Sequence, residues 1–312
     1  MALRNVIVIG SGPAGCTAAI YAARAGLEPL LVAGLLQGGQ LTQSSGVENW
    51  PGAHHFPSGF ELMESLLEHV RKFDVEILQD SVSTLTREDG VFSLHMAGGE
   101  VLTARSVIAA TGSSARYLGI PGEDRFRGSG ISACATCDGF FFRKKRVVVI
   151  GGGNTAVTDA LYLAGLGAKT SLVHRRNEFR CEKILTDKLM SAADEGRISL
   201  HLSKVPLEFV GGESLEGVRI RDTVTGEESV LATDGVFEAV GHVPNTGYLE
   251  GLLELDRGYI PLAGDPEHAT ATAVPGLFAA GDVANARYQQ AVVAAGSGCM
   301  AALDAEHYLS ML

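Results

Sequence analysis

The chain has 312 residues, 46% of them hydrophobic, which is enough for two packed domains and argues against disorder. Its net charge of −11, from 25 basic and 36 acidic side chains, would repel a phosphate backbone, so nucleic acid is not an expected partner. No apolar run approaches the roughly 20 residues that a membrane-spanning helix needs. Met1 leads almost directly into a strand pattern, which leaves no room for a signal peptide, so a cytoplasmic location is expected.

The first predicted element is a buried parallel strand over residues 6–9, which read VIVI. A Gly-rich turn, a helix of small residues and a second apolar strand follow, so that residues 6–34 form a β-α-β unit. The turn reads Gly10-x-Gly12-x-x-Gly15. Its first glycine permits a tight turn, its second lets the backbone approach a pyrophosphate, and its third lets the helix pack on the strand. The helix N-terminus then offers free N–H groups to that pyrophosphate.

The second strand of this unit ends without the Asp or Glu that commonly holds a ribose hydroxyl. Ala33 and Gly34 stand at that position. We therefore expect the ribose to be held by backbone groups or by the nearby Gln37 and Gln40.

A C-x-x-C pair lies in the middle of the chain, within the sequence SACATCDGFFF at residues 132–142. The pair could be a redox disulfide, half of a metal site, or two thiols in a buried loop. Zinc would need two more soft ligands, and no second C-x-x-C is present. Of the three phenylalanines that follow, some are expected in the core, and at least one could be exposed to dock a partner protein. Cys16 and Cys299 lie in apolar or helical contexts and are expected to be buried and inert.

The β-α-β pattern repeats over residues 147–175, which align with the first unit without a gap. The second turn reads Gly151-x-Gly153-x-x-Ala156. Two such turns in register, each after a strand and before a helix, are strong evidence for two dinucleotide sites.

The second unit ends in a basic sequence, HRRNEFR, that holds Arg175, Arg176 and Arg180. A carboxylate there would repel a 2′-phosphate, whereas arginines pair with one bidentately. This ending favours NADP(H) over NAD(H) at the second site.

Two further stretches belong with the first dinucleotide site. Residues 107–114, VIAATGSS, predict a strand that ends in a tight Thr-Gly turn, and residues 276–302 predict a strand, a Gly-Asp turn and an apolar helix. In the second stretch Gly281 allows close approach of a ligand, and Asp282 can accept a hydrogen bond from a hydroxyl group. The helix that follows can direct its N-terminus at negative charge.

Several motifs occur in an order that resembles a known family: GSGPAG, GGQLT, VENWPG, ATGSSARYLGIPG, SACATCDGFFF, GGGNTAV, HRRNEFR, GHVPN and GLFAAGDV. Together they resemble the low-molecular-weight thioredoxin reductases, from about residue 5 to the C-terminus. The resemblance implies an α/β fold with two Rossmann-like dinucleotide-binding domains, the second inserted in the first. The FAD-binding domain would comprise residues 1–113 and 244–312, and the NADPH-binding domain would comprise residues 114–243. Gly/Pro-rich sequences at both crossings agree with these bounds.

The resemblance also implies an activity, the reduction of the disulfide of thioredoxin by NADPH through FAD, carried out by a homodimer. A redox-active disulfide between Cys134 and Cys137 would carry the electrons. Cys137 would be the thiol nearer the flavin, Cys134 would attack the disulfide of the partner protein, and Asp138 would move the proton.

The binding residues carry over by position. FAD contacts are expected from Gly10, Gly12, Pro13, Ala14, Gly15, Gln40, Asn49, Thr111, Gly112, Gly281, Asp282, Gln290 and Ala291. NADPH contacts are expected from Gly151, Gly153, Asn154, Thr155, His174, Arg175, Arg176 and Arg180. No metal is expected.

The chain departs from the family pattern at two places. Thr158 and Asp159 follow GGGNTAV, where acidic residues are common, and Gln289 stands where the family commonly has an arginine near the flavin. Other functions stay open: reduction of another thioredoxin-like or peroxiredoxin-linked carrier, a flavin dithiol oxidase, or a redox sensor. An oxidase would not need the basic sequence HRRNEFR.

Overall fold

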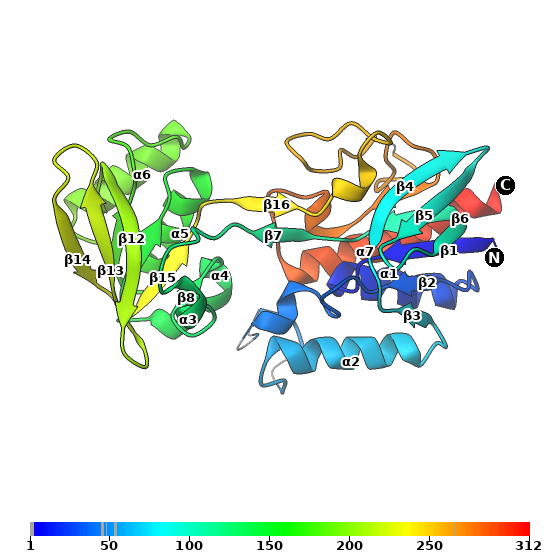
Figure 1. Cartoon of the computed structure of the whole chain (residues 1–312), viewed down its shortest axis with the longest axis horizontal. Coiled ribbons are helices and arrows are strands. Elements are labelled where there is room, and N and C mark those ends of the chain that lie inside the picture. Colours follow the sequence, from blue (N-terminus) through cyan, green and yellow to red (C-terminus); the bar gives the residue numbers. More distant parts are fainter. Residues whose placement is uncertain (1–2, 45–46, 48, 53–54, 265) are drawn as a thin grey trace. The chain divides into compact units, whose positions relative to one another are not determined.

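The computed structural model describes residues 3–44, 47, 49–52, 55–264 and 266–312, and Figure 1 labels its elements. The chain divides into two compact units. Unit 1 comprises Met1–Ser114 and Val243–Leu312, and unit 2 comprises Ala115–His242. Unit 2 is therefore inserted in unit 1.

Unit 1 is built on a seven-stranded sheet of order β3-β2-β1-β6-β5-β4, with β17 paired to β6. Its elements are β1 (Arg4–Ile9), α1 (Pro13–Arg24), β2 (Leu30–Val32), η1 (Gln40–Gln43), α2 (Gly59–Arg71), β3 (Glu76–Leu78), β4 (Val82–Glu88), β5 (Val91–Met96), β6 (Val101–Ala109), η3 (Gly247–Leu249), β17 (Leu277–Ala279), η4 (Gly281–Val283) and α7 (Ala291–Ser310). Strands β1, β2, β3, β6 and β17 are parallel, whereas β4 and β5 form an antiparallel hairpin that continues onto β6.

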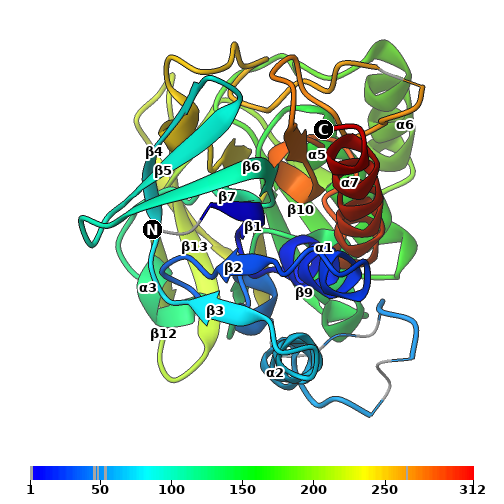
Figure 2. The same cartoon turned by 90° about the vertical axis from the view of Figure 1, so that its right-hand side faces the viewer.

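Strands β2 and β17 and the carboxyl-terminal residues of β1 and β6 are buried, whereas the edge strand β3 is partly exposed. Helices α1, α2 and α7 contribute to the core on one face, where Met63 of α2 is fully buried. Helices α1 and α7 lie side by side, as Figures 1 and 2 show. They pack closely because both are rich in small residues: a side chain at Gly298 of α7 would collide with the carbonyl oxygen of Ala14 in α1.

Unit 2 contains a five-stranded parallel sheet of order β11-β10-β9-β15-β8 and a three-stranded antiparallel sheet of order β12-β13-β14. Its elements are α3 (Glu123–Phe126), β8 (Ile131–Ser132), α4 (Ala135–Asp138), η2 (Gly139–Phe142), β9 (Arg146–Ile150), α5 (Asn154–Gly165), β10 (Lys169–Val173), α6 (Lys183–Asp194), β11 (Ile198–His201), β12 (Lys204–Gly211), β13 (Leu215–Asp222), β14 (Glu228–Ala232) and β15 (Gly235–Glu238). One face of the parallel sheet packs on α5 and α6, and the other packs on the antiparallel sheet.

The chain crosses between the units twice, and the two crossings pair with each other. Strands β7 (Ser113–Ala115) and β16 (His242–Pro244) form a separate two-stranded sheet. Asn245 adds side-chain hydrogen bonds at the unit 1 end: its Nδ2 donates to the carbonyl of Thr111 at 2.9 Å, and its Oδ1 accepts from the Ser114 hydroxyl at 3.0 Å.

Candidate functional site

The first Gly-rich turn lies at the carboxyl edge of the unit 1 sheet. Strands β1, β6 and β17 are parallel neighbours, so the residues that follow them meet at one edge. Gly10 follows β1, Thr111 and Gly112 follow β6, and Gly281 follows β17. The tertiary structure thus brings together predicted site residues from both ends of the chain.

The three glycines of this turn have different surroundings. Gly10 has φ +108°, and a Cβ there would lie 2.3 Å from the carbonyl oxygen of Ala110. A Cβ on Gly15 would lie 1.6 Å from the oxygen of Gly10, so the helix packs on the turn as predicted. A Cβ on Gly12 would meet nothing within 4 Å. Close packing therefore explains why positions 10 and 15 hold glycine. The open space beside Gly12 instead leaves its backbone accessible to a ligand.

Helix α1 begins directly after this open glycine. Pro13 occupies the first turn, Ala14 follows it, and no side chain caps the helix N-terminus. The first N–H groups and the helix dipole therefore lie at the open turn without a side-chain cap from the described residues. This arrangement fits the pyrophosphate of a dinucleotide.

Asp282 is the acidic group of this edge. It follows Gly281 in η4, and burial raises the pKa of its carboxyl to about 6. Its carboxylate accepts no hydrogen bond within the described residues, although the neighbouring Gly281 N–H donates to the Ser297 hydroxyl at 2.8 Å. This half-buried carboxylate can therefore accept a hydrogen bond from a ligand hydroxyl group.

The remaining residues predicted for FAD lie in η1, in the segment after it and at the start of α7. Gln40 donates through Nε2 to the carbonyl of Ser113. Asn49 donates through Nδ2 to Oε1 of Gln290 at 3.2 Å, and Ala291 begins α7. Glu48 of the predicted VENWPG motif lies outside the described residues.

The second Gly-rich turn has the same construction in unit 2. Gly151 follows β9, with φ +155°, and a Cβ there would lie 2.5 Å from the oxygen of Ala239. Gly153 has nothing within 4 Å of its Cβ position, and α5 begins after it without a side-chain cap. Asn154 and Thr155 form its first turn, and Asn154 exchanges hydrogen bonds with Glu182. This turn therefore offers a second open helix N-terminus.

Three arginines gather beside this second turn. The charge of Arg180 lowers the pKa of Arg176 most, followed by desolvation and the charge of Arg175, so both neighbouring guanidinium groups act on Arg176. Within the described part of the chain, none of them forms an ion pair or a side-chain hydrogen bond. The Arg180 N–H donates to the carbonyl of Gly152 at 2.8 Å, which ties the basic loop to the turn. A cluster of cations without protein acids fits a phosphate group.

His174 occupies a different place from the arginines. Its ring is 7% exposed, stacks on Phe179, and lies so close to Gly152 that a Cβ there would overlap it. Its Nε2 lies 3.0 Å from the carbonyl of Glu178. Burial lowers the pKa of His174 most, and the nearby arginine charges lower it further. The ring therefore packs beneath the turn, and its predicted contact with NADPH stays a prediction.

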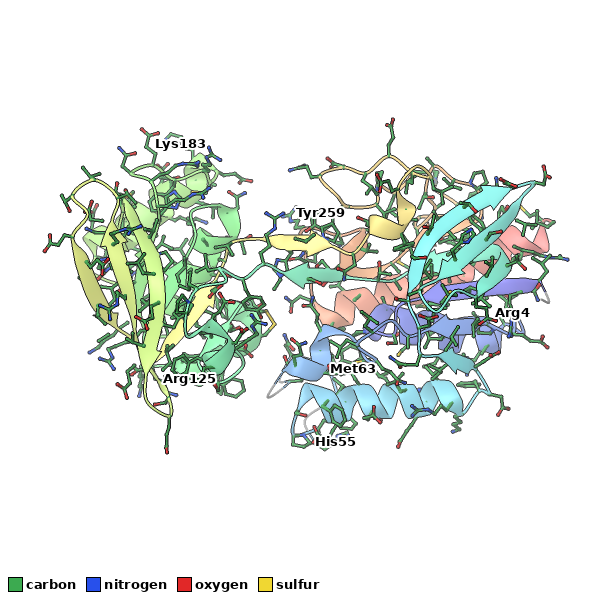
Figure 3. The ribbon with its side chains drawn as sticks, in the orientation of Figure 1. Arg4, His55, Met63, Arg125, Lys183 and Tyr259 are labelled. Carbon is green, nitrogen blue, oxygen red and sulfur yellow. A yellow bond between two sulfur atoms is a disulfide. The ribbon has the colours of Figure 1, made fainter. Side chains whose placement is uncertain are left out.

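The C-x-x-C pair lies between β8 and β9 of unit 2, and we call residues 133–138 the redox loop. Cys134 and Cys137 form a disulfide (Figure 3), which confirms the predicted pairing. The Cys134 N–H donates to the Ser132 hydroxyl at 3.0 Å, and α4 carries Cys137. Both cysteines are partly exposed, so a partner could reach a sulfur atom.

Asp138 ends α4 immediately after the disulfide. Burial raises the pKa of its carboxyl, and a hydrogen bond with Ser132 lowers it by a smaller amount. Its Oδ1 is buried and has no hydrogen-bond partner among the described residues. The carboxyl therefore keeps its proton to a higher pH than an ordinary aspartate, as a general acid requires.

The three phenylalanines after the disulfide divide as expected between core and surface. Phe142 packs edge-on against Phe237 and lies over Gly235. Phe140 and Phe141 are 48% and 41% exposed. Two neighbouring aromatic rings are therefore accessible beside the redox loop.

The other cysteines are reduced. Cys16 is buried as predicted, and burial raises the pKa of its thiol to about 12. The prediction for Cys299 was wrong, because it lies on a partly exposed face of α7. A helical context alone does not show which face of the helix is covered.

Sequence reasoning did not single out Ser11, and it named Gln289 only as a departure from the family pattern. Ser11 is buried, donates to the carbonyl of Ala33 at 2.7 Å and accepts from the Gly38 N–H at 2.9 Å. It thereby shapes the loop that lacks a ribose-binding acid. Gln289 has φ +40°, and its Nε2 lies 3.4 Å from the hydroxyls of Ser113 and Tyr259, the latter labelled in Figure 3.

The described ranges offer neither a metal-binding cluster nor a membrane-spanning helix. No group of three or more His, Cys, Asp or Glu side chains placed to hold a metal ion occurs among them. In the same ranges, no helix has both the length and the apolar character needed to cross a membrane.

Comparison with known proteins identifies the family. Residues 4–298 match the family model described as pyridine nucleotide-disulphide oxidoreductase. A thioredoxin reductase of Escherichia coli O157:H7 is 50% identical over 311 residues, covering 99% of this chain and 97% of the relative. A Pseudomonas fluorescens protein named glucosaminate ammonia-lyase is also 50% identical over 310 residues, which cover 99% of this chain and 96% of that relative. The solved thioredoxin reductase of Giardia duodenalis superposes with a TM-score of 0.92 at 36% identity, covering both chains fully.

The chain therefore belongs to the pyridine nucleotide-disulphide oxidoreductase family. Its α/β fold with two dinucleotide-binding units is that of its structural neighbours. Within the family it is similar to the bacterial-type thioredoxin reductases, as its motifs predicted.

Proposed function

We propose that the protein is a thioredoxin-disulfide reductase that uses NADPH and FAD. One observation carries the proposal: a partly exposed disulfide lies in the same compact unit as an open Gly-rich turn with three arginines that form no ion pair with any described residue. The net reaction transfers two electrons from NADPH, with one proton from solvent, to a protein disulfide, which becomes a dithiol. Bound FAD would supply the two-electron relay between NADPH and the Cys134–Cys137 disulfide.

We assign FAD to unit 1 and NADPH to unit 2. The open space above Gly12 and the half-buried carboxylate of Asp282, which has no hydrogen-bond partner among the described residues, support FAD. The arginine cluster and the open space above Gly153 support NADPH, because an arginine cluster suits the 2′-phosphate that distinguishes NADPH from NADH. Residues of the two turns would bind and orient the pyrophosphates through backbone N–H groups.

The reduced thiols would act in sequence. Cys134 attacks one sulfur of the partner's disulfide, which forms a mixed disulfide and releases a partner thiolate. Asp138 donates the proton that the leaving thiolate takes up. Cys137 then attacks Cys134, which re-forms the enzyme disulfide and releases the partner as a dithiol. The raised pKa of Asp138 supports its role as the acid.

The partner would be recognised beside the disulfide. Phe140 and Phe141 are exposed aromatic side chains next to the redox loop, and aromatic residues are enriched at binding hot spots. Replacing both with Ala should raise KM for thioredoxin and leave flavin reduction by NADPH unchanged.

We also propose a homodimer. Tyr21 of α1 and Val293, Met300 and Leu303 of α7 are exposed, although α1 and α7 belong to the core of unit 1. Such an apolar helix face fits a second copy of the chain. Sedimentation analysis should give twice the monomer mass, and Leu303→Glu should shift it toward the monomer.

NADPH oxidation measured with a panel of thioredoxin-like proteins tests the assignment. Rapid turnover with thioredoxin supports the assignment. Turnover with another dithiol carrier but not with thioredoxin would show that the carrier is the substrate. NADPH-dependent oxygen consumption without a protein disulfide would instead indicate an oxidase. We expect activity in the cytoplasm, where NADPH is regenerated.

The relative named glucosaminate ammonia-lyase suggests a further control. Elimination of ammonia requires neither a redox disulfide nor a nicotinamide, so the redox loop favours the reductase. Release of ammonia from glucosaminate by this protein, without turnover of any protein disulfide, would contradict the proposal.

A further inference from the structure

Two buried carboxyl groups hold the segment through which the chain enters unit 2. We call residues 115–122 the crossing segment. The Leu118 N–H donates to Oε2 of Glu238, at the end of β15, at 3.0 Å. The next N–H, of Gly119, donates to Oε2 of Glu123, at the start of α3, at 2.7 Å. Consecutive amides of the crossing segment are therefore bound by two acids of unit 2.

These acids are buried but share a single cation. Glu123 and Glu238 are 3% and 2% exposed. The Arg127 guanidinium pairs with Oε1 of Glu123 at 2.9 Å and also with the exposed Asp124 at 3.0 Å. Oε1 of Glu238 is buried and has no hydrogen-bond partner among the described residues. The surroundings therefore compensate one buried negative charge better than two.

The charge state of Glu238 reflects this imbalance. Burial, and then the charge of Glu123, raise its pKa to about 7, while the Leu118 N–H and Arg127 oppose the shift. The other titratable group beside them is Tyr117, whose ring lies under Arg127 at 4.0 Å. Burial raises the pKa of Tyr117 most, and the charges of Glu238, Glu123 and Asp138 raise it further. The negative charge beside Glu238 therefore comes from Glu123 of α3, whereas Tyr117 of the crossing segment keeps its proton and stays neutral near pH 7.

The direction of the effect follows from proton linkage. A carboxyl group binds its proton more tightly when buried in this cluster than when hydrated in an opened segment. The proton therefore stabilises the closed cluster, and this stabilisation is lost as pH rises from about 4.5 through about 7. Above that range Glu238 is ionised beside Glu123, and Arg127 is the cation paired with this cluster among the described residues. The repulsion favours opening of the crossing segment and hydration of Glu238.

Solvent can reach the outer side of this cluster. Residues 119–125, Arg127 and residues 208–211 line a groove of about 870 Å³. Arg125 of α3, labelled in Figure 3, closes one side by donating to the carbonyl of Gly211. The groove gives a route for proton exchange when the crossing segment opens.

We propose that Glu238 is a proton-controlled anchor of the crossing segment: its protonated form keeps the segment bound to unit 2, and its ionisation loosens the segment. Glu238 pairs with Ile150 and so adjoins the second Gly-rich turn, but the anchor does not depend on the proposed enzymatic function. It would make the flexibility of one connection between the two units depend on pH near neutrality.

Amide hydrogen exchange of the intact protein tests the anchor, with exchange rates corrected for the intrinsic effect of pH. In the wild type, local opening of a peptide covering residues 115–122 should increase up to about tenfold between pH 6 and pH 8, for a carboxyl whose pKa is about 7. Glu238→Gln keeps the size of the side chain and an acceptor for Leu118, but cannot ionise. Its opening should be the same at both pH values.

Asp159→Asn is the matched control. Burial raises the pKa of Asp159 to about 7 as well, but this residue lies in α5 and does not bind the crossing segment. The variant should keep the wild-type pH response of residues 115–122. An infrared difference spectrum of the wild type should also show one carboxylic acid band lost between pH 6 and pH 8 that is missing from Glu238→Gln. Constant opening in the wild type, the same pH response in Glu238→Gln, or the absence of that band would overturn the proposal.

Discussion

Replacing Gly12 or Gly15 with Ala should separate ligand binding from folding within one turn. Gly12 precedes α1 with φ −68° and ψ −174°, which alanine can adopt, and its Cβ would meet no protein atom within 4 Å. Loss of a glycine N-cap costs about 1 kcal/mol. Alanine also lowers the conformational entropy of the unfolded chain, which stabilises the folded protein by roughly 0.4–1 kcal/mol. The free energy of unfolding of the Gly12→Ala apoprotein should therefore stay within about 1 kcal/mol of the wild type.

The same methyl group should interfere with FAD. A pyrophosphate at the open turn would approach the backbone where the new Cβ lies, and loss of one charge-assisted hydrogen bond lowers affinity about 10- to 150-fold. Flavin absorbance of the purified protein and titration of the apoprotein with FAD measure this effect. A Gly12→Ala protein that binds FAD as tightly as the wild type would refute the assignment of this turn.

Gly15→Ala is the contrasting variant. Its Cβ would lie 1.6 Å from the carbonyl oxygen of Gly10, a backbone atom that cannot move without displacing the turn. We expect a loss of about 3 kcal/mol or more in the free energy of unfolding, measured on the apoprotein by denaturant titration. Equal stability of the two variants would show that the packing of the turn does not distinguish these glycines.

Three more variants test the proposed chemistry. Cys134→Ser should abolish reduction of thioredoxin but still allow NADPH to bleach the flavin. Normal thioredoxin reduction by this variant would contradict the role assigned to Cys134. Asp138→Asn should slow thioredoxin reduction about a hundred- to ten-thousandfold. Because burial raises the pKa of Asp138, the wild-type rate should fall as pH rises through that pKa, and this decline should be absent from the Asn variant. Combined Ala substitution of Arg175 and Arg176 should weaken NADPH binding by about two to four powers of ten without affecting NADH, whereas Arg221→Ala, an exposed control in β13, should change neither.

The amino-acid sequence by itself determined the parts of the protein that depend on local spacing. Both Gly-rich turns follow a strand and precede a helix, as their glycine spacing predicted. The pairing of Cys134 with Cys137 also agrees with the resemblance that the motif order indicated. These features span a few residues, so residue type and spacing alone constrain them.

The tertiary structure decided which distant groups share one environment. It placed His174 beneath Gly152, and it left Cys299 partly exposed. It brought Leu118 to Glu238, 120 residues further along the chain. A carboxyl in sequence carries no sign of burial or of the charges beside it, because both depend on chain packing. The pKa of Glu238, and the anchor proposed from it, therefore become visible only when the strands of unit 2 are assembled.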